Sequence, residues 1–314
     1  MNERHTLDSD AQEMVDLLAE RMPLPFHLMG VQGTRDFIAS FPQPDEMTDV
    51  AEVRDVWTGE NESRIRLRVV TPIREEGLPI LLWIHGGGWT FGTVEGSEPL
   101  CRHLAKLSGC IVVSVEYRLA PEYPFPAPLQ DCVEAFLWLR ANAASLGGDP
   151  SRLAIGGDSA GGNLAVGVTR ALMNSGDSLP LCQLLAYPAL GWKGPLESRS
   201  LYADGPLMTW ADVEWFTSLY AGEDGNALDE LAFPSNSMSF EGFPQTLVIL
   251  AEVDVLRDEG TSFADVLVCQ GVKAAARVYP GVFHGFFTEV DFLSRAKEAV
   301  GDSAEFLSSV FSRT

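Results

Sequence analysis

The sequence predicts an α/β fold with a doubly wound, mostly parallel sheet. Strand-length segments that are almost wholly apolar recur along the chain, as expected for strands that helices cover on both faces. These segments are residues 79–85, 110–115, 152–156, 181–187, 246–251 and 273–279. Helical segments alternate with them, which is the order of βαβ units. The helical segments are residues 97–108, 128–144, 160–174, 258–270 and 290–311.

Two further strands, residues 53–58 and 65–71, are predicted to pair at one edge of this sheet. Arginines at positions 64, 66 and 68 alternate with aliphatic residues at positions 65, 67 and 69. Alternation of this kind is typical of a strand with one buried and one solvated face. We therefore expect the arginine face of this pair to be solvated.

Two segments interrupt or precede the alternation. Residues 1–45 are helix-like, with Met14, Leu17, Leu18 and Met22 on one helical face, but prolines at positions 23, 25, 42 and 44 break them. Between the core strands, residues 189–244 contain no clear core strand. Within them, residues 209–221 are predicted to form a helix, because Trp215/Leu219 and Phe216/Tyr220 are i,i+4 pairs. That helix could simply dock on the core, but an insertion of this length favours a cap over a pocket.

Composition limits the partners. The chain of 314 residues has 44 acidic and 22 basic residues, for a net charge of −22. A field of that sign repels nucleic acid and anionic lipid surfaces, so neither is expected to bind. Solubility explains the acidic excess more simply than adaptation to salt does.

The cysteines and the apolar runs indicate a cytoplasmic protein. The cysteines at positions 101, 110, 132, 182 and 269 are odd in number, form no CxxC pair and lie mostly in apolar runs. This pattern predicts buried free thiols in a reducing compartment, without a disulfide framework or a zinc site. The N-terminus is polar, unlike a signal peptide, and no apolar run could span a bilayer, so no stable membrane association is expected.

The sequence GDSAG at residues 157–161 matches the GxSxG nucleophile elbow. An apolar strand precedes it and an apolar helix follows, as this sharp turn requires. In that context Ser159 is the candidate nucleophile, and the N–H of Ala160 is a candidate oxyanion donor. The alternative is a glycine-rich helix start with an ordinary N-cap serine.

A second glycine motif, HGGG at residues 85–88, directly follows an apolar strand. Consecutive glycines let the backbone approach a ligand and direct N–H groups at a developing negative charge. We expect Gly86 and Gly87 to complete the oxyanion hole and His85 to anchor the loop by hydrogen bonds. A tight turn is the alternative, although it would need one glycine and not three.

His284 is the candidate general base, because it follows a core strand, where α/β sheets build their sites. The other histidines lie in the N-terminal segment, in the glycine motif or in a surface helix. Asp254, shortly after the preceding core strand, is the candidate acid that orients the imidazole. Asp258 is the runner-up, but it lies in a helix start, where an acid has a sufficient role. The order Ser159, Asp254, His284 is that of α/β-hydrolases.

These motifs together resemble the hormone-sensitive-lipase-like carboxylesterases, over roughly residues 50 to 310. The segments that carry the resemblance are HGGGW at 85–89, YRLAPE at 117–122, GDSAGGN at 157–163, DVLRDE at 254–259 and HGF at 284–286. The resemblance implies an α/β-hydrolase core of residues 46–188 and 245–314. It implies a helical cap of residues 1–45 and 189–244, and ester substrates with short to medium acyl chains. One departure is Val255, where the family usually has proline.

The function predicted from these observations is a serine carboxylesterase that hydrolyses small-molecule esters through an acyl-enzyme, with no metal or cofactor. Trp89, Trp215 and Phe216 are expected to line an enclosed apolar pocket. An amidase or deacetylase with the same triad is one alternative. A small-molecule binding protein with a residual triad is another; the resemblance includes plant receptors that lack the catalytic histidine, but His284 is present here. The oligomeric state stays open, with a homodimer as one option.

Overall fold

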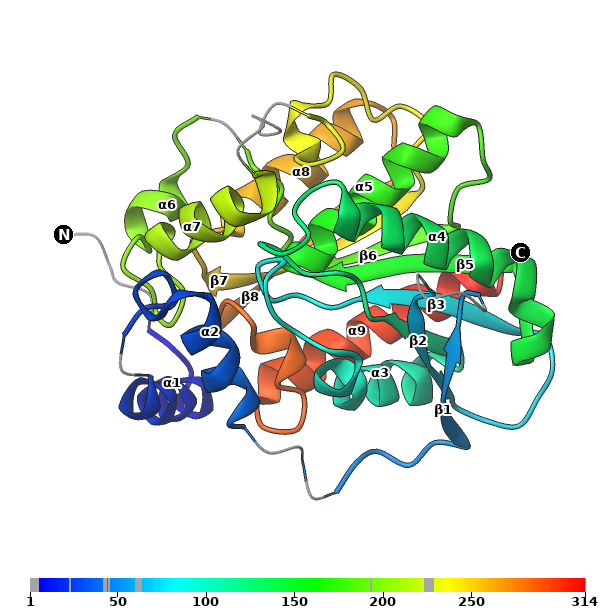
Figure 1. Ribbon diagram of the computed structural model, residues 1–314, viewed down its shortest axis with the longest axis horizontal. Helices are drawn as coiled ribbons and strands as arrows, with labels where there is room; N and C mark the ends of the chain where they lie inside the picture. Colours follow the sequence, from blue (N-terminus) through cyan, green and yellow to red (C-terminus); the bar gives the residue numbers. More distant parts are fainter. Residues whose placement is uncertain are drawn as a thin grey trace.

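The computed structural model describes residues 6–22, 24–41, 44, 46–59, 64–192, 194–222 and 229–313. Its centre is one eight-stranded sheet of order β1-β2-β4-β3-β5-β6-β7-β8 (Figure 1). The strands are β1 (Glu52–Trp57), β2 (Arg66–Thr71), β3 (Leu78–Ile84), β4 (Ile111–Val115), β5 (Gly148–Asp158), β6 (Cys182–Ala186), β7 (Gln245–Val253) and β8 (Ala274–Phe283). The six neighbouring strands β4, β3, β5, β6, β7 and β8 are all parallel, and β2 is antiparallel to both β1 and β4. The predicted mostly parallel sheet and its edge pair are confirmed.

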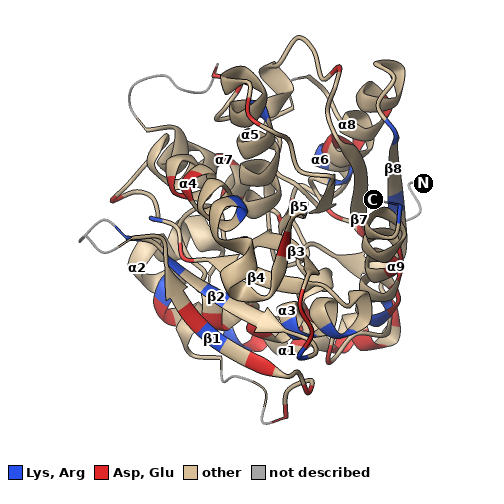
Figure 2. Ribbon diagram, turned by 90° about the vertical axis from the view of Figure 1, so that its right-hand side faces the viewer, with Lys and Arg blue, Asp and Glu red and all other residues tan. Residues whose placement is uncertain are grey.

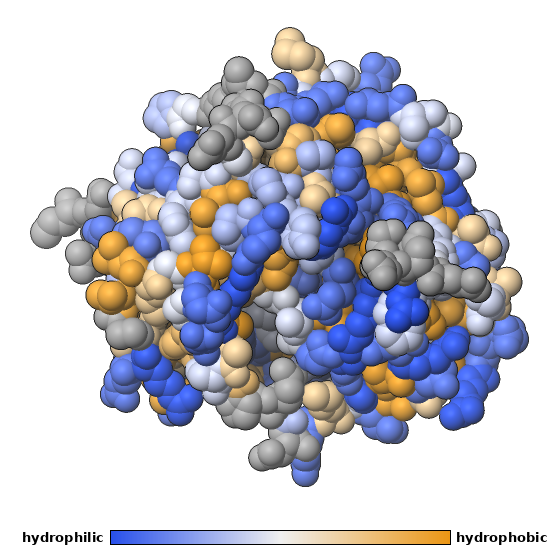
Figure 3. Space-filling model, in the orientation of Figure 1, coloured by the Kyte–Doolittle hydropathy of each residue, from blue (hydrophilic) through white to orange (hydrophobic). Residues whose placement is uncertain are grey.

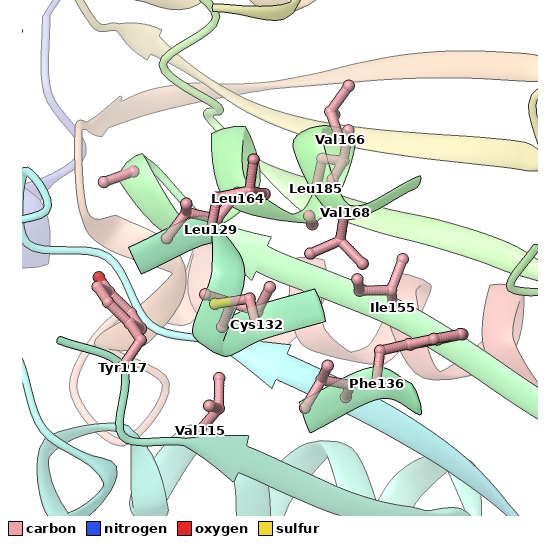
Figure 4. Packing of buried hydrophobic residues seen from close by; sticks show 14 of the residues in the cluster. Val115, Tyr117, Leu129, Cys132, Phe136, Ile155, Leu164, Val166, Val168 and Leu185 are labelled. Atoms are coloured by element: carbon pink, nitrogen blue, oxygen red, sulfur yellow. The ribbon is translucent and has the colours of Figure 1, made fainter. Parts of the chain in front are cut away.

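Helices cover both faces of the sheet, as the continuous apolar strands require. On one face lie α4 (Ala127–Asn142), α5 (Ala160–Ser175) and α8 (Arg257–Cys269); on the other lie α3 (Val94–Ser108) and α9 (Ser294–Phe311) (Figure 1). The two faces bury separate apolar clusters. Figure 4 shows part of the first cluster, in which Cys132 and Phe136 of α4 lie beside Leu164 and Val168 of α5. The protein therefore has a two-sided core with the sheet in the middle.

The arginine face of the edge pair differs from the expectation. Arg66 and Arg68 bind the carboxylate of Asp55 on β1, and both also reach Glu95 at the start of α3. Figure 2 shows these opposite charges side by side on β1 and β2. Arg68 also pairs with Glu98, and its side chain is only 13% exposed. The arginine face is therefore only partly solvated, because carboxylates of β1 and α3 pair with it, and alternation alone does not show what lies above a polar face.

Four helices gather at the carboxyl ends of the parallel strands. They are α1 (Ser9–Arg21), α2 (Phe26–Ala39), α6 (Glu197–Leu201) and α7 (Trp210–Ala221), at the left in Figure 1. The predicted helix over residues 209–221 is confirmed as α7, and a capping box between Thr209 and Asp212 fixes its start. Of the prolines expected to break the N-terminal segment, Pro25 caps α2; those at positions 23 and 42 lie outside the described residues, as does the histidine at position 5.

The remaining short helices are η1 (Ala143–Leu146), η3 (Pro234–Asn236) and η4 (Phe286–Thr288). Within the described ranges, no helix has both the length and the apolar character needed to cross a membrane. On the face shown in Figure 3, apolar residues form small groups separated by hydrophilic ones. All five cysteines are free, and four are buried as expected. Cys269 is the exception, because it ends α8 on the solvent side.

Candidate active site

Ser159 occupies a strained turn between β5 and α5. Its backbone has φ 53° and ψ −117°, a conformation that side-chain-bearing residues rarely adopt. The flanking glycines are required by close packing, because a Cβ atom on Gly157 or Gly161 would overlap the carbonyl oxygen of Ile84. This turn is the strand-to-helix elbow that the sequence predicted. It lifts the serine hydroxyl off the end of the sheet.

The three candidate triad residues lie in one hydrogen-bonded chain. His284 Nε2 is 3.0 Å from Ser159 Oγ, and His284 Nδ1 is 2.8 Å from Asp254 Oδ2. The other oxygen of Asp254 accepts the N–H of Leu256 at 2.8 Å, and the carboxylate is fully shielded. The runner-up acid, Asp258, instead accepts the N–H of Ser198 and pairs with Arg257. A carboxylate held on Nδ1 leaves Nε2 free to accept the serine proton.

His85 holds the glycine loop and does not reach the triad. Its Nδ1 lies 2.8 Å from the carbonyl oxygen of Gly86, to which it donates a proton. The ring stacks on Tyr117 at 4.3 Å between centroids, and the Tyr117 hydroxyl donates to the His85 carbonyl. Burial lowers the pKa of His85 to about 4, so the ring is neutral. A neutral, stacked imidazole fits the anchoring role expected for it.

The three glycines of the HGGG loop have different surroundings. Gly87 and Ala160 line the cavity beside Ser159, but Gly86 does not. A Cβ on Gly86 would overlap the carboxylate of Asp158, and a hydrogen bond from the Gly86 backbone lowers the pKa of that carboxyl. Gly88 lines the cavity instead. Gly87 and Gly88 have positive φ angles, 105° and 55°, which the sequence does not specify.

Asp158 is a buried carboxyl that sequence reasoning did not single out. Burial raises its pKa to about 6, and hydrogen bonding from the Gly86 backbone and the nearby His284 oppose that rise. Its side chain therefore connects the elbow to the glycine loop. The only sequence signal was its position directly before the nucleophile.

A cavity of about 260 Å³ opens onto Ser159 and His284. Most of its wall is apolar and comes partly from the helices at the strand ends: Met14 and Leu18 of α1, and Phe26 and Ile38 of α2. The cavity therefore combines N-terminal residues with the predicted catalytic residues. Sequence reasoning placed Met14 and Leu18 on one apolar helical face of the expected cap, but it did not single out Phe26 or Ile38.

The three expected pocket residues have different places. Phe216 lines the cavity and lies 5.9 Å from Phe26 between ring centroids. Trp89 lines it too, although its ring is 2% exposed and stacks on Tyr220 at 4.4 Å. Trp215 is not among the lining residues; α7 contributes Val213 and Phe216 instead. These two are three positions apart and share one helical face, whereas Trp215 lies around the helix from both.

Polar contacts fasten α2 to its neighbours. Arg35 donates to both carboxylate oxygens of Glu122 at 2.7 Å and to the carbonyl oxygens of Thr90 and Ala120. The hydrogen bond from Arg35 lowers the pKa of Glu122 to about 2. His27 Nδ1 lies 2.7 Å from Asp212, which is the third residue of α7 and forms the capping box with Thr209. Thus α2 is bonded both to α7 and to the segment beside the glycine loop.

Comparison with known proteins agrees with this geometry. A family model described as an alpha/beta hydrolase fold matches residues 81–288. The carboxylesterase NlhH of Mycobacterium tuberculosis is 32% identical over 308 residues, which cover 96% of each chain.

Solved structures are similar over nearly the whole chain. An ester hydrolase, EH1AB1, from the metagenome of Lake Arreo has a TM-score of 0.89 and 36% identity, covering 98% of this chain and 100% of that one. A hyperthermophilic esterase from Pyrobaculum calidifontis has a TM-score of 0.88 and 35% identity, covering 97% of this chain and 98% of that one. The chain therefore is a carboxylic ester hydrolase and belongs to the hormone-sensitive-lipase-like carboxylesterases of the α/β-hydrolase fold.

Proposed function

We propose that Ser159, His284 and Asp254 carry out carboxylester hydrolysis through an acyl-enzyme intermediate. The observation that carries this proposal is the unbroken hydrogen-bonded chain from Ser159 Oγ through both ring nitrogens of His284 to Asp254. It opens onto an apolar cavity, which is the environment an acyl or alkyl group requires. Each of the three groups thus has a role that its contacts support.

In the acylation step, Ser159 Oγ attacks the acyl carbon while His284 Nε2 takes the serine proton. The imidazolium then gives this proton to the leaving alkoxide oxygen as the ester C–O bond breaks. In deacylation, His284 takes a proton from water, and the oxygen of that water bonds to the acyl carbon. The serine oxygen leaves with the proton from the imidazolium, so the enzyme is regenerated and the products are an alcohol and a carboxylic acid.

The oxyanion hole that we propose consists of the N–H groups of Gly87, Gly88 and Ala160. All three residues line the cavity next to Ser159, which supports their selection over Gly86. Backbone donors fixed before the reaction stabilise the charge that develops on the substrate oxygen without reorganising. Asp158 would act as a positioning residue, because it engages Gly86 and so fixes the loop.

We further propose that residues 1–45 and 189–244 form a cap that limits substrate length. Its support is the cavity wall made by α1, α2 and α7, together with the bonds that tie α2 to Asp212 and Glu122. A cavity of about 260 Å³ favours short to medium acyl chains. An open trough for long-chain triglycerides would lack this wall.

The test of the proposed function is a panel of p-nitrophenyl esters of increasing chain length, measured with the wild type and with Ser159→Ala. Activity should peak at short to medium chains and vanish in the variant. Matched ester and anilide substrates separate an esterase from an amidase or deacetylase, since an amidase would cleave the anilide at a comparable rate. A fluorophosphonate separates the enzyme from a binding protein, because a protein that only binds would not be labelled at Ser159.

We also propose a cellular location and an oligomeric state for the enzyme. The free thiols, four of them buried, support a reducing compartment such as the cytoplasm. Fractionation of cells would test the location. The protein could form a homodimer, and measuring the sedimentation velocity of the purified protein would test this prediction.

A further inference from the structure

Glu289 lies in the wall of the active-site cavity, five positions after the proposed base. The short helix η4 separates it from His284, and Glu289 directly follows that helix. Its N–H donates to the carbonyl oxygen of Phe286 at 3.0 Å. Its carbonyl oxygen accepts the N–H groups of Phe292 and Leu293. The backbone is thus fixed on both sides of this residue, which lines the cavity.

The carboxyl group of Glu289 has no basic partner among the described residues. Its carboxyl group accepts one hydrogen bond from a described side chain, a long one from Thr288 Oγ1 at 3.5 Å. The pKa of Glu289 is raised to about 7, mainly by burial; the Thr288 contact opposes the rise and the nearby carboxylate of Asp291 adds to it. No basic group among these contributions offsets the burial.

The charged groups on the elements around Glu289 are acidic or already paired. His103 of α3 binds Asp291 at 2.8 Å, and Arg295 of α9 binds Asp8 and Glu298. The titratable groups that share the cavity wall are Asp158, Tyr187 and His284. Asp254 stands behind His284, and Asp10 of α1 accepts the N–H of Ser294. Within the described part of the chain, no lysine or arginine lines the cavity.

We propose that Glu289 is a specificity-determining residue that binds a cationic group on the ester substrate. The proposal rests on the proposed esterase function, since it names the chemistry of the substrate for that same cavity. A carboxylate in an apolar wall is costly unless a counter-charge accompanies it. A substrate ammonium would supply the charge that the described residues lack, whereas an anionic substrate would be repelled by both Glu289 and Asp158.

The cation could belong to the acyl or to the alcohol part of the ester, and two pairs of isosteres distinguish these sources. Butyrylcholine and 3,3-dimethylbutyl butyrate differ only by nitrogen or carbon at the branched centre of the alcohol. Ethyl 4-(trimethylammonio)butyrate and ethyl 5,5-dimethylhexanoate differ in the same way in the acyl part. For each pair the readout is the ratio of kcat/KM for the charged ester to kcat/KM for the neutral one.

The variants are Glu289→Gln, which keeps the shape and removes the charge, and Asp291→Asn as a matched control. Asp291 is a carboxylate two positions away that does not line the cavity. Both esters of a pair are hydrolysed by the same triad. A general loss of catalytic activity therefore lowers both kcat/KM values equally and cancels in their ratio. For at least one pair, Glu289→Gln should lower the ratio by about tenfold or more, as expected when one close charge pair is lost. At pH 8.5, where the carboxyl of Glu289 is ionised with or without the charge of Asp291, Asp291→Asn should change the ratio by less than about threefold.

The pH dependence of the wild type is a second readout that needs no variant. Because the pKa of Glu289 is about 7, its carboxyl is neutral below that pH and negative above it. The charged-to-neutral ratio should therefore rise between about pH 6 and pH 8.5, while the substrate's fixed charge does not change. The carboxyl of Asp158, whose pKa is about 6, contributes at the lower end. In Glu289→Gln the rise near pH 7 should disappear.

Equal ratios in the wild type and in Glu289→Gln for both pairs would overturn the proposal, as would a flat wild-type pH profile. An equal fall in Glu289→Gln and Asp291→Asn would also overturn it, because the effect would then come from the general acidic field. None of these results affects the esterase proposal, which is tested separately by hydrolysis of the neutral esters and its loss in Ser159→Ala.

Discussion

Replacing Phe216 with alanine should move the acyl-chain optimum to longer esters. The Phe216 ring is 5% exposed, forms part of the cavity wall and closes it over the backbone of Gly88, where an added Cβ would overlap the ring. Each CH₂ buried in an apolar cavity contributes about 0.8 kcal/mol, or about fourfold in kcat/KM. In the wild type this gain should continue along the ester series until the chain fills the cavity of about 260 Å³, and kcat/KM should then fall.

Removing the Phe216 ring enlarges the cavity, so the variant should accept about two more CH₂ groups before the decline and gain about tenfold or more for those esters. Short esters should lose kcat/KM because they no longer touch the wall. The unfolding free energy should fall by up to about 3–5 kcal/mol, the range for a buried phenylalanine. Thermal unfolding of each variant checks that the protein measured is folded.

Trp215→Ala is the matched control for Phe216→Ala. It removes an aromatic ring from the adjacent position of α7, but Trp215 does not line the cavity. The assay is hydrolysis of p-nitrophenyl esters from acetate to laurate by both variants and the wild type. The control should keep the wild-type optimum. An unchanged optimum in folded Phe216→Ala, or the same displacement in both variants, would refute the reasoning.

The other predictions concern the triad, the oxyanion hole and the N-terminal segment. Asp254→Asn should lower kcat by about 10⁴ because it favours the wrong imidazole tautomer; a larger loss in folded Asp258→Asn would show that the acid is misassigned. Gly87→Pro removes an N–H donor and should cost about 10²–10³ in kcat, so a folded variant with wild-type kcat would exclude this donor. Truncation before Phe41 removes α1 and the whole of α2, and should raise KM and flatten the chain-length profile. An unaltered profile in the folded, truncated protein would mean that the segment does not limit the substrate.

The sheet was predictable because strands that are buried on both faces are almost entirely apolar in sequence. Every residue of β4 is buried, and so is every residue of β6, and each strand is apolar except for one residue, Ser114 in β4 and Gln183 in β6. The helix α7 was predictable for a similar reason, because its aromatic pairs recur at helical spacing. The covering of Arg66 and Arg68 by α3 was not predictable, since their carboxylate partners come from a different element.

The candidate site was predictable where a short motif fixes the backbone. Around Ser159 the packing against Ile84 admits only glycine at two positions, so the requirement is visible in the sequence. The choice between Gly86 and Gly88 was not visible, because three consecutive glycines look alike until their φ angles are known. The contributions of Met14 and Ile38 to the cavity also depend on how distant helices dock. Local motifs therefore predicted the proposed chemistry, whereas the cavity wall required tertiary structure.

Fluorophosphonate labelling with a chemical readout of the modified residue tests the central claim most directly. The reagent should inactivate the wild type with one label per chain, and peptide mapping should find that label on Ser159. Ser159→Ala should take up no label and should lose esterase activity by about 10⁶-fold, as when triad members act as a unit. Labelling at another residue, or a folded Ser159→Ala protein that keeps its esterase activity, would contradict the account.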